Sequence, residues 1–74
     1  MKWQRTILED GTRKHCADTG NKILCVYDGR FKHGIRSRNV YWYIYDHDEK
    51  VTNLKGDSLT VKMAKKRAER LSRA

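Results

Sequence analysis

The sequence contains no proline and no long apolar run, and both absences limit what the chain can form. Its two most apolar stretches are Ile23–Tyr27 and Val40–Tyr45, whereas a membrane-spanning helix needs about 20 apolar residues. Neither stretch has the character of a signal-peptide core. We therefore expect a cytoplasmic protein without a membrane segment, whose strands and helices run without proline breaks.

The chain also lacks internal repeats, low-complexity runs and linkers rich in glycine, serine or proline. A chain of 74 residues has room for one domain, because it buries little more than about 60% of its unfolded surface. Its hydrophobic content of 38%, with two Trp and four Tyr, is nevertheless too high for a disordered tail. We expect a single folded domain over residues 1–74.

Cysteine is scarce, and the two that occur, Cys16 and Cys25, come without a secretory signal. We expect reduced thiols that serve as packing residues. His15, His33 and His47 add potential zinc ligands, but no Cys-x2-Cys or His-x3-His spacing exists, so we expect no metal and no cofactor. The sequence shows no Ser-His-Asp arrangement, no paired carboxylates and no phosphate-cradling glycine motif. We therefore expect no catalytic residues and no enzyme activity.

Acidic residues are few: nine Asp and Glu stand against seventeen Lys and Arg, which gives a formal net charge of +8. Such a field raises the rate at which a protein meets DNA, RNA or an acidic protein surface. It carries no information about sequence specificity. Nucleic acid is the partner that we expect, although a charge of this kind can also serve solubility alone.

Residue patterns with a period of two predict several short strands. The strongest is Val40–Tyr45, in which Val40, Trp42 and Ile44 face one way and the three tyrosines between and after them face the other. Lys22–Tyr27 is apolar on both parities, which favours a central strand. Turn-forming residues delimit three further expected strands: Lys2–Leu8, Arg13–Asp18 and Lys50–Leu54.

After Gly56-Asp57 the apolar spacing changes to nearly four, which predicts a helix from about Thr60 to Ser72. Thr60 is the expected N-cap, with Asp57 and Ser58 as competing caps. The expected fold class is α+β: a small antiparallel β-sheet of three to five strands with one C-terminal helix packed on one face. The apolar stripe that would contact the sheet consists of Val61, Ala64, Ala68 and Leu71.

The expected helix carries cations where a helix tolerates them poorly. Lys62, Lys65 and Lys66 lie in its first two turns, at the positive end of the macrodipole. Lys62 with Lys66, and Lys66 with Arg70, are like-charge pairs four residues apart. A bound phosphate backbone would relieve this repulsion, so we name Lys62 and Lys66 as candidate nucleic-acid contacts. A solvated helix face is the alternative.

A second group of cations precedes the strongest strand, and Gly34 interrupts it. Arginine can fork onto phosphate oxygens or a guanine edge, and glycine lets the backbone approach a phosphate. The alternative is an ordinary charged loop. Reversing Arg30, Lys32 and Arg36 to Glu should abolish binding and leave the melting temperature nearly unchanged, because exposed substitutions cost little stability. The candidate contacts in this loop are Arg30, Lys32, Arg36 and Arg38, with His33 among them.

Tyr41, Tyr43 and Tyr45 form an aromatic stripe, and Tyr27 is expected beside it on the neighbouring strand. Two readings are open. If the helix packs on the face of Val40, the tyrosines lie on an exposed sheet, where bases could stack on Tyr41 and Tyr43. If the helix packs on the tyrosine face, they are core residues.

The order of the parts resembles the N-terminal arm-DNA-binding domain of phage-type tyrosine integrases and the similar AP2-like domains of plants. The resemblance covers Asn39–Leu71 and rests on the aromatic strand Tyr41–Tyr45, a turn at Asp46–Glu49, another strand, and the start of the helix at Thr60–Lys65. In that family the sheet enters the major groove and the helix backs it, which implies DNA rather than RNA as the ligand. Small phage and prophage proteins that open with a Trp-containing strand are similar in outline.

The resemblance implies further DNA-facing residues on the early strands, namely Arg5, Arg13 and Lys14, together with Arg30, Lys32 and Arg36. The chain departs from the family pattern at Lys62 and Met63, where acidic residues are common. The recombinase domain of that family has no counterpart in these 74 residues, so we expect no integration chemistry.

Two functions follow from these patterns. The first is a non-enzymatic nucleic-acid-binding module, a phage or prophage accessory factor that contacts phosphates through its basic loop and helix. The second is a small protein-interaction module or inhibitor that docks on an acidic or nucleic-acid-binding host protein. The sequence leaves the oligomeric state open.

Overall fold

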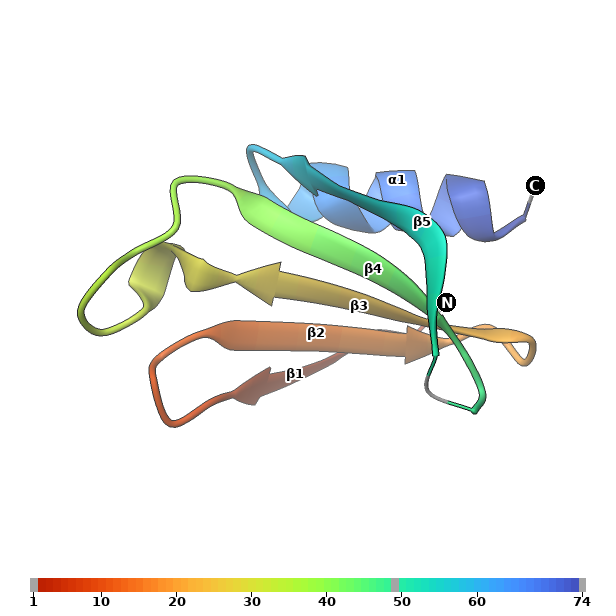
Figure 1. Cartoon of the computed structure of the whole chain (residues 1–74), viewed down its shortest axis with the longest axis horizontal. Coiled ribbons are helices and arrows are strands. Elements are labelled where there is room, and N and C mark those ends of the chain that lie inside the picture. Colours follow the sequence, from red (N-terminus) through yellow and green to blue (C-terminus); the bar gives the residue numbers. More distant parts are fainter. Residues whose placement is uncertain (1, 49, 74) are drawn as a thin grey trace.

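The computed structural model describes residues 2–48 and 50–73, which form one antiparallel sheet and a C-terminal helix (Figure 1). The five strands are hydrogen-bonded in chain order, so each pairs with its neighbours in sequence. This confirms the α+β class with a C-terminal helix. The strands are β1 (Gln4–Ile7), β2 (Arg13–Asp18), β3 (Lys22–Asp28), β4 (Val40–Asp46) and β5 (Val51–Ser58); the 3-10 helix η1 (Gly29–Phe31) follows β3, and α1 spans Val61–Ser72.

The turns form where the sequence predicts them. Gly11 and Gly20 have φ angles of +87° and +95°, a region that glycine enters without steric cost. The side chains of Asp10 and Asp18 accept hydrogen bonds from the backbone N–H of the residue two positions later, at 2.9 and 2.8 Å. These local bonds set the registers of the β1–β2 and β2–β3 hairpins.

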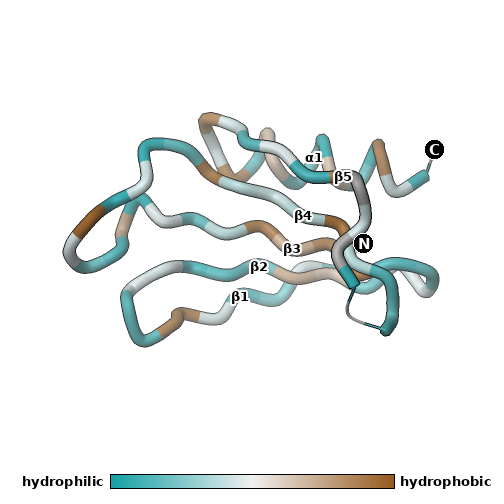
Figure 2. The backbone as a smooth tube through the Cα atoms, viewed as in Figure 1, coloured by the Kyte–Doolittle hydropathy of each residue, from teal (hydrophilic) through white to brown (hydrophobic). Residues whose placement is uncertain are grey.

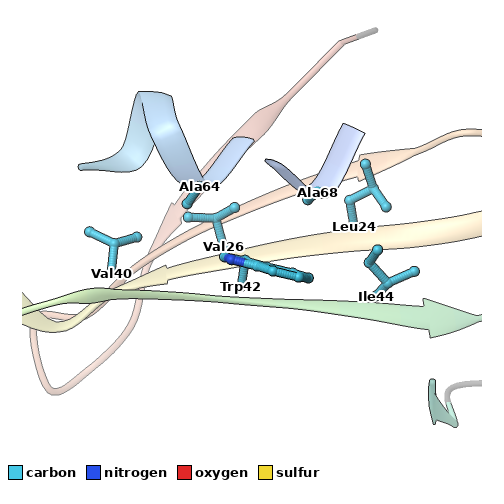
Figure 3. Close-up of a cluster of buried hydrophobic side chains, with 7 residues drawn as sticks. All are labelled: Leu24, Val26, Val40, Trp42, Ile44, Ala64 and Ala68. Carbon is cyan, nitrogen blue, oxygen red and sulfur yellow. The ribbon is translucent and has the colours of Figure 1, made fainter. Parts of the chain in front are cut away.

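The core lies between α1 and one face of strands β3 and β4 (Figure 3), and Leu54 of β5 packs against it. Hydrophobic segments are visible in β3 and β4, whereas the helix alternates between hydrophobic and hydrophilic residues (Figure 2). The helix therefore covers the Val40 face of β4, which decides between the two readings of the tyrosine stripe. The buried cluster consists of Leu24, Val26, Val40, Trp42, Ile44, Ala64 and Ala68.

The start of α1 confirms the predicted N-cap. Thr60 is extended and its Oγ1 accepts a hydrogen bond from the backbone N–H of Met63 at 3.2 Å. The helix is joined to the opposite end of the chain by Trp3, which packs against the core. The indole Nε1–H of Trp3 donates to Oε1 of Glu69 at 2.8 Å.

Strand β5 runs four residues beyond the predicted end at Leu54 and includes Gly56 and Asp57, after which the apolar spacing changes to that of a helix. Gly56 lies opposite Trp42 in the register. A Cβ atom built at Gly56 would lie 2.7 Å from Cζ2 of Trp42. The glycine therefore makes room for a core indole within a strand, a role that its turn-like sequence context concealed.

Neither helix within the described ranges combines the length and the apolar composition that crossing a lipid bilayer requires.

Candidate nucleic-acid interface

The face of the sheet away from α1 carries three cross-strand rows of side chains. Residues paired across antiparallel strands point to the same face, and neighbours along a strand alternate. Because the core residues of β3 and β4 point toward α1, the residues between them form the open face. The rows are Thr6, Lys14, Tyr27, Tyr41 and Asp57; then Gln4, Cys16, Cys25, Tyr43 and Lys55; then Asp18, Ile23 and Tyr45.

Four tyrosines occupy the centre of this open face. Tyr41 is 42% exposed, and Tyr27, Tyr43 and Tyr45 are half-buried. The rings of Tyr27 and Tyr43 meet edge to face with centroids 5.7 Å apart, and those of Tyr43 and Tyr45 lie 6.3 Å apart. Burial, with a hydrogen bond to the Tyr27 hydroxyl, raises the pKa of Tyr45 to about 12. The tyrosines thus form one continuous aromatic surface.

Two lysines flank the tyrosines. The Nζ of Lys14 lies 5.6 Å from the centre of the Tyr27 ring, and Lys55 pairs with Tyr43 across β4 and β5. Open hollows are lined on one side by Lys14, Tyr27 and Tyr45, and on the other by Tyr41, Tyr43 and Lys55. A flat aromatic surface with a cation at each side can hold bases by stacking and phosphates by charge.

Cys16 and Cys25 lie next to the tyrosines in the middle row. Both are free thiols, and their Sγ atoms are 3.2 Å apart. Burial, with a hydrogen bond to Cys16, raises the pKa of Cys25 to about 12, which keeps that thiol protonated. Among the described residues, no three His, Cys, Asp or Glu side chains gather as metal ligands would.

The basic loop between β3 and β4 contributes fewer free cations than the sequence indicates. Arg30 forms two side-chain hydrogen bonds to the buried carboxylate of Asp28, from Nε to Oδ1 and from Nη2 to Oδ2, each at 2.9 Å. Its Nη1 also donates to the backbone oxygen of Leu59 at 3.2 Å. Lys32 Nζ lies 3.8 Å from Oδ2 of Asp10.

Arg30 is half-buried and its guanidinium neutralises the Asp28 carboxylate, so a charge reversal at this position would not leave the stability unchanged as the sequence indicates. Its hydrogen bonds hold the pKa of Asp28 below the usual value. Arg36 and Arg38 are exposed, as expected, and they lie in the connection that leads into β4. The loop thus supplies two exposed arginines at one end of the sheet.

The structure does not bring all of the candidate residues to one face. Arg5 and Arg13 point to the same side of the sheet as α1. Arg13 pairs with Asp28, and Arg5 pairs with His15, which in turn pairs with the core residue Val26. Lys14 points to the open face. The expectation that these three residues face one ligand together is therefore not met. Lys62 and Lys66 are exposed on α1, on the side opposite to the tyrosines.

Lys55 belongs to the open face but was missed in the sequence. Its position opposite Tyr43 follows from the pairing of β4 with β5, but only if β5 continues past Leu54, where the sequence predicts the strand to end. Tyr27 was expected beside the stripe, and its pairing with Tyr41 confirms this position.

Comparison with protein-family models, curated proteins and solved structures found no match to this chain.

Proposed function

We propose that the protein is a non-enzymatic module that binds single-stranded nucleic acid on the open face of its sheet. The observation that carries this proposal is that α1 covers the Val40 face and leaves four tyrosines uncovered. Base stacking on aromatic side chains is tolerant of sequence, because every base has a π-face. The absence of catalytic motifs in the sequence supports a binding role without chemistry.

The spacing of the tyrosines supports contacts with successive bases. Alternate residues of a strand lie roughly 6.8 Å apart, so Tyr41, Tyr43 and Tyr45 present rings at regular intervals along β4. Tyr27 widens this surface toward β3. An extended strand of nucleic acid could therefore follow β4 and place bases on the rings.

The charges on this face also favour a polyanion. Lys14 and Lys55 are half-buried and exposed, respectively, and neither forms an ion pair among the described residues. The two acidic side chains of the face already have partners. Asp57 accepts a hydrogen bond from Asn39 at 2.8 Å, and Asp18 accepts one from the Gly20 N–H and contacts His47. The net charge of +8 would speed the encounter.

The test is fluorescence anisotropy with a labelled oligothymidine of about 12 nucleotides, a length within the known range for one small domain. Tyr41→Ala should weaken binding roughly 5- to 150-fold, the equivalent of one lost base–aromatic stack of about 1–3 kcal/mol. Tyr41→Phe is the matched control, because it keeps the ring and should bind like the wild type. Circular dichroism should show unchanged folding for both variants.

Equal binding by Tyr41→Ala and the wild type would place the ligand elsewhere. If the wild type bound neither oligothymidine nor oligouridine, the proposal would fail, and docking on an acidic host protein would be the better reading. DNA is the nucleic acid that we propose first. A cytoplasmic role as a phage or prophage accessory factor is part of the same proposal.

A further inference from the structure

The side of the molecule that carries α1 has an unusual concentration of cations. Of the charged residues in this helix, only Glu69 is acidic, and its Oε1 accepts the hydrogen bond from Trp3. Ala64 and Ala68 face the sheet, so the opposite side of the helix points into solvent, away from the tyrosines. The exposed cations along it are Lys62, Lys66, Arg67, Arg70 and Arg73.

Cations from β1 and β2 extend this surface beyond the helix. Arg5 and Arg13 point to the helix side from β1 and β2, which lie beside the strands that α1 mainly contacts. The guanidinium of Arg13 lies 3.9 Å from the centre of the Phe31 ring, and Lys65 Nζ lies 5.3 Å from that of Trp3. Aromatic rings therefore hold two of the cations in place.

The surroundings of His15 show that these positive charges lie close to one another. It lies on β2 directly opposite Arg5 and two residues after Arg13, and it is half-buried on the helix side. Burial lowers its pKa most, and the positive charges of Lys65 and Arg5 lower it further. A helix residue and a strand residue thus act on the same imidazole, which indicates one connected positive surface.

These cations form no ion pair among the described residues. Within residues 2–48 and 50–73, ion pairs involve Lys22, Arg30, Lys32, His47 and Lys50, none of which belongs to this surface. The helix is about 18 Å long and therefore presents a line of charge. A line of cations matches a duplex, whose phosphates repeat evenly along its axis.

We propose that the helix side is a second nucleic-acid-binding surface, which contacts the phosphates of a duplex, so that one chain bridges a single strand and a duplex. The duplex lies against α1 and the helix side of β1 and β2. The single strand lies on the tyrosine face. The bridging role rests on the proposed function of that face, whereas the duplex contact does not.

The experiment immobilises oligothymidine on beads, adds the protein, and measures capture of a fluorescent duplex. Wild-type protein should retain the duplex. The helix variant combines Lys62→Glu, Lys66→Gln and Arg70→Gln. It should lower duplex capture roughly tenfold or more and reduce the log–log salt slope by about 0.9 for each lost phosphate contact. Its affinity for oligothymidine alone should stay within about twofold, since stacking carries that contact.

Two controls make the result specific. A charge-matched variant with Arg36→Gln, Arg38→Gln and Lys50→Glu should capture more duplex than the helix variant does; equal loss in both would overturn the assigned surface. The helix variant should melt at or above the wild-type temperature, because it places an acid in the first turn and removes like-charge pairs. Reduced capture would then not reflect unfolding.

Mixing experiments test whether one chain carries both surfaces. An equimolar mixture of Tyr41→Ala and the helix variant should not retain the duplex, whereas a bridge built from two chains would survive mixing and overturn the proposal. Wild-type protein that binds oligothymidine but captures no duplex would overturn bridging and leave the proposed function standing. If oligothymidine binding itself is absent, the proposed function and the bridge both fail, and direct duplex titration of the helix variant still tests the helix side.

Discussion

At the residue scale, the carboxylate of Asp28 shows how one buried charge restricts its neighbours. Asp28 is 1% exposed, and its oxygens accept hydrogen bonds from the backbone N–H and the guanidinium of Arg30. A buried ion without its partner retains the full cost of desolvation. Arg30 therefore stabilises the folded chain through its pairing with Asp28.

We predict that Arg30→Ala lowers the free energy of unfolding by roughly 1–3 kcal/mol, because it leaves the Asp28 carboxylate without its main donors. Arg38→Ala removes an exposed charge nearby and should change stability by less than about 0.5 kcal/mol. Urea denaturation followed by circular dichroism measures both. Equal stability of the two variants would contradict the structural role of Arg30.

The same pair gives a pH dependence. The hydrogen bonds from Arg30 make the pKa of Asp28 lower in the folded chain than its ordinary value of 3.8. The carboxylate therefore contributes stability above that value, and the contribution is lost as the pH falls toward the lowered pKa. As the pH is lowered through this range, the free energy of unfolding of Asp28→Asn should therefore fall less than that of the wild type.

Gly56 is a second residue whose role only the structure shows. We predict that Gly56→Ala lowers the free energy of unfolding by about 1–3 kcal/mol, because the added methyl group would overlap the Trp42 ring. Lys55→Ala, on the same strand and exposed, is the control and should have little effect. Thermal unfolding distinguishes them. A Gly56→Ala protein that melts like the wild type would show that the indole can move aside.

At the element scale, the strands and the helix follow from residue periodicity, and their centres are predicted well. The alternation at Val40–Tyr45 and the four-residue spacing from Val61 both reflect burial of one side of an element, which repeats with the backbone geometry. The end of β5 was not predictable in this way. Gly56-Asp57 has the composition of a turn, and only contact with Trp42 explains a glycine inside a strand.

The charges at the start of α1 give a prediction for this element. Lys62→Glu should raise the free energy of unfolding by about 0.3–1 kcal/mol, since a carboxylate in the first turn interacts favourably with the helix dipole and can also pair with Lys66. Arg73→Glu is the matched control: the same charge change at the other end of the helix should destabilise it. Denaturant titrations at low salt should show changes in the free energy of unfolding of opposite sign for the two variants. Changes of the same sign would exclude a dipole effect.

At the scale of the whole molecule, the sequence could not decide which face of the sheet the helix covers. Both faces of β4 are rich in large side chains, so periodicity alone leaves them equivalent. The two faces differ in how water solvates them. Tyrosine hydroxyls can keep hydrogen bonds to water, whereas the side chains of Val40 and Ile44 have no polar atom and are more stable when buried. The separation of Arg13 from Lys14 follows from alternation along β2, whereas which of the two shares a face with α1 depends on the same choice of face.

The contact between Trp3 and Glu69 has a consequence for the rates of folding. Each strand pairs with its sequence neighbours, so most of the sheet can grow by adding hairpins, which requires closing only short loops. The Trp3–Glu69 hydrogen bond instead spans 66 residues. We expect it to form after the transition state, which already contains the local hairpins and the packed helix.

Removing the acceptor with Glu69→Ala should therefore speed unfolding about fivefold, for a loss of about 1 kcal/mol, while the folding rate stays nearly constant. Glu69→Gln keeps an acceptor oxygen and should leave both rates close to wild type. Stopped-flow measurements over a range of urea concentrations separate the two limbs, and a slower folding limb in Glu69→Ala would place this contact in the folding nucleus. If only the unfolding rate changes, the contact between Trp3 and Glu69 sets how long the native state lasts rather than how quickly it is reached.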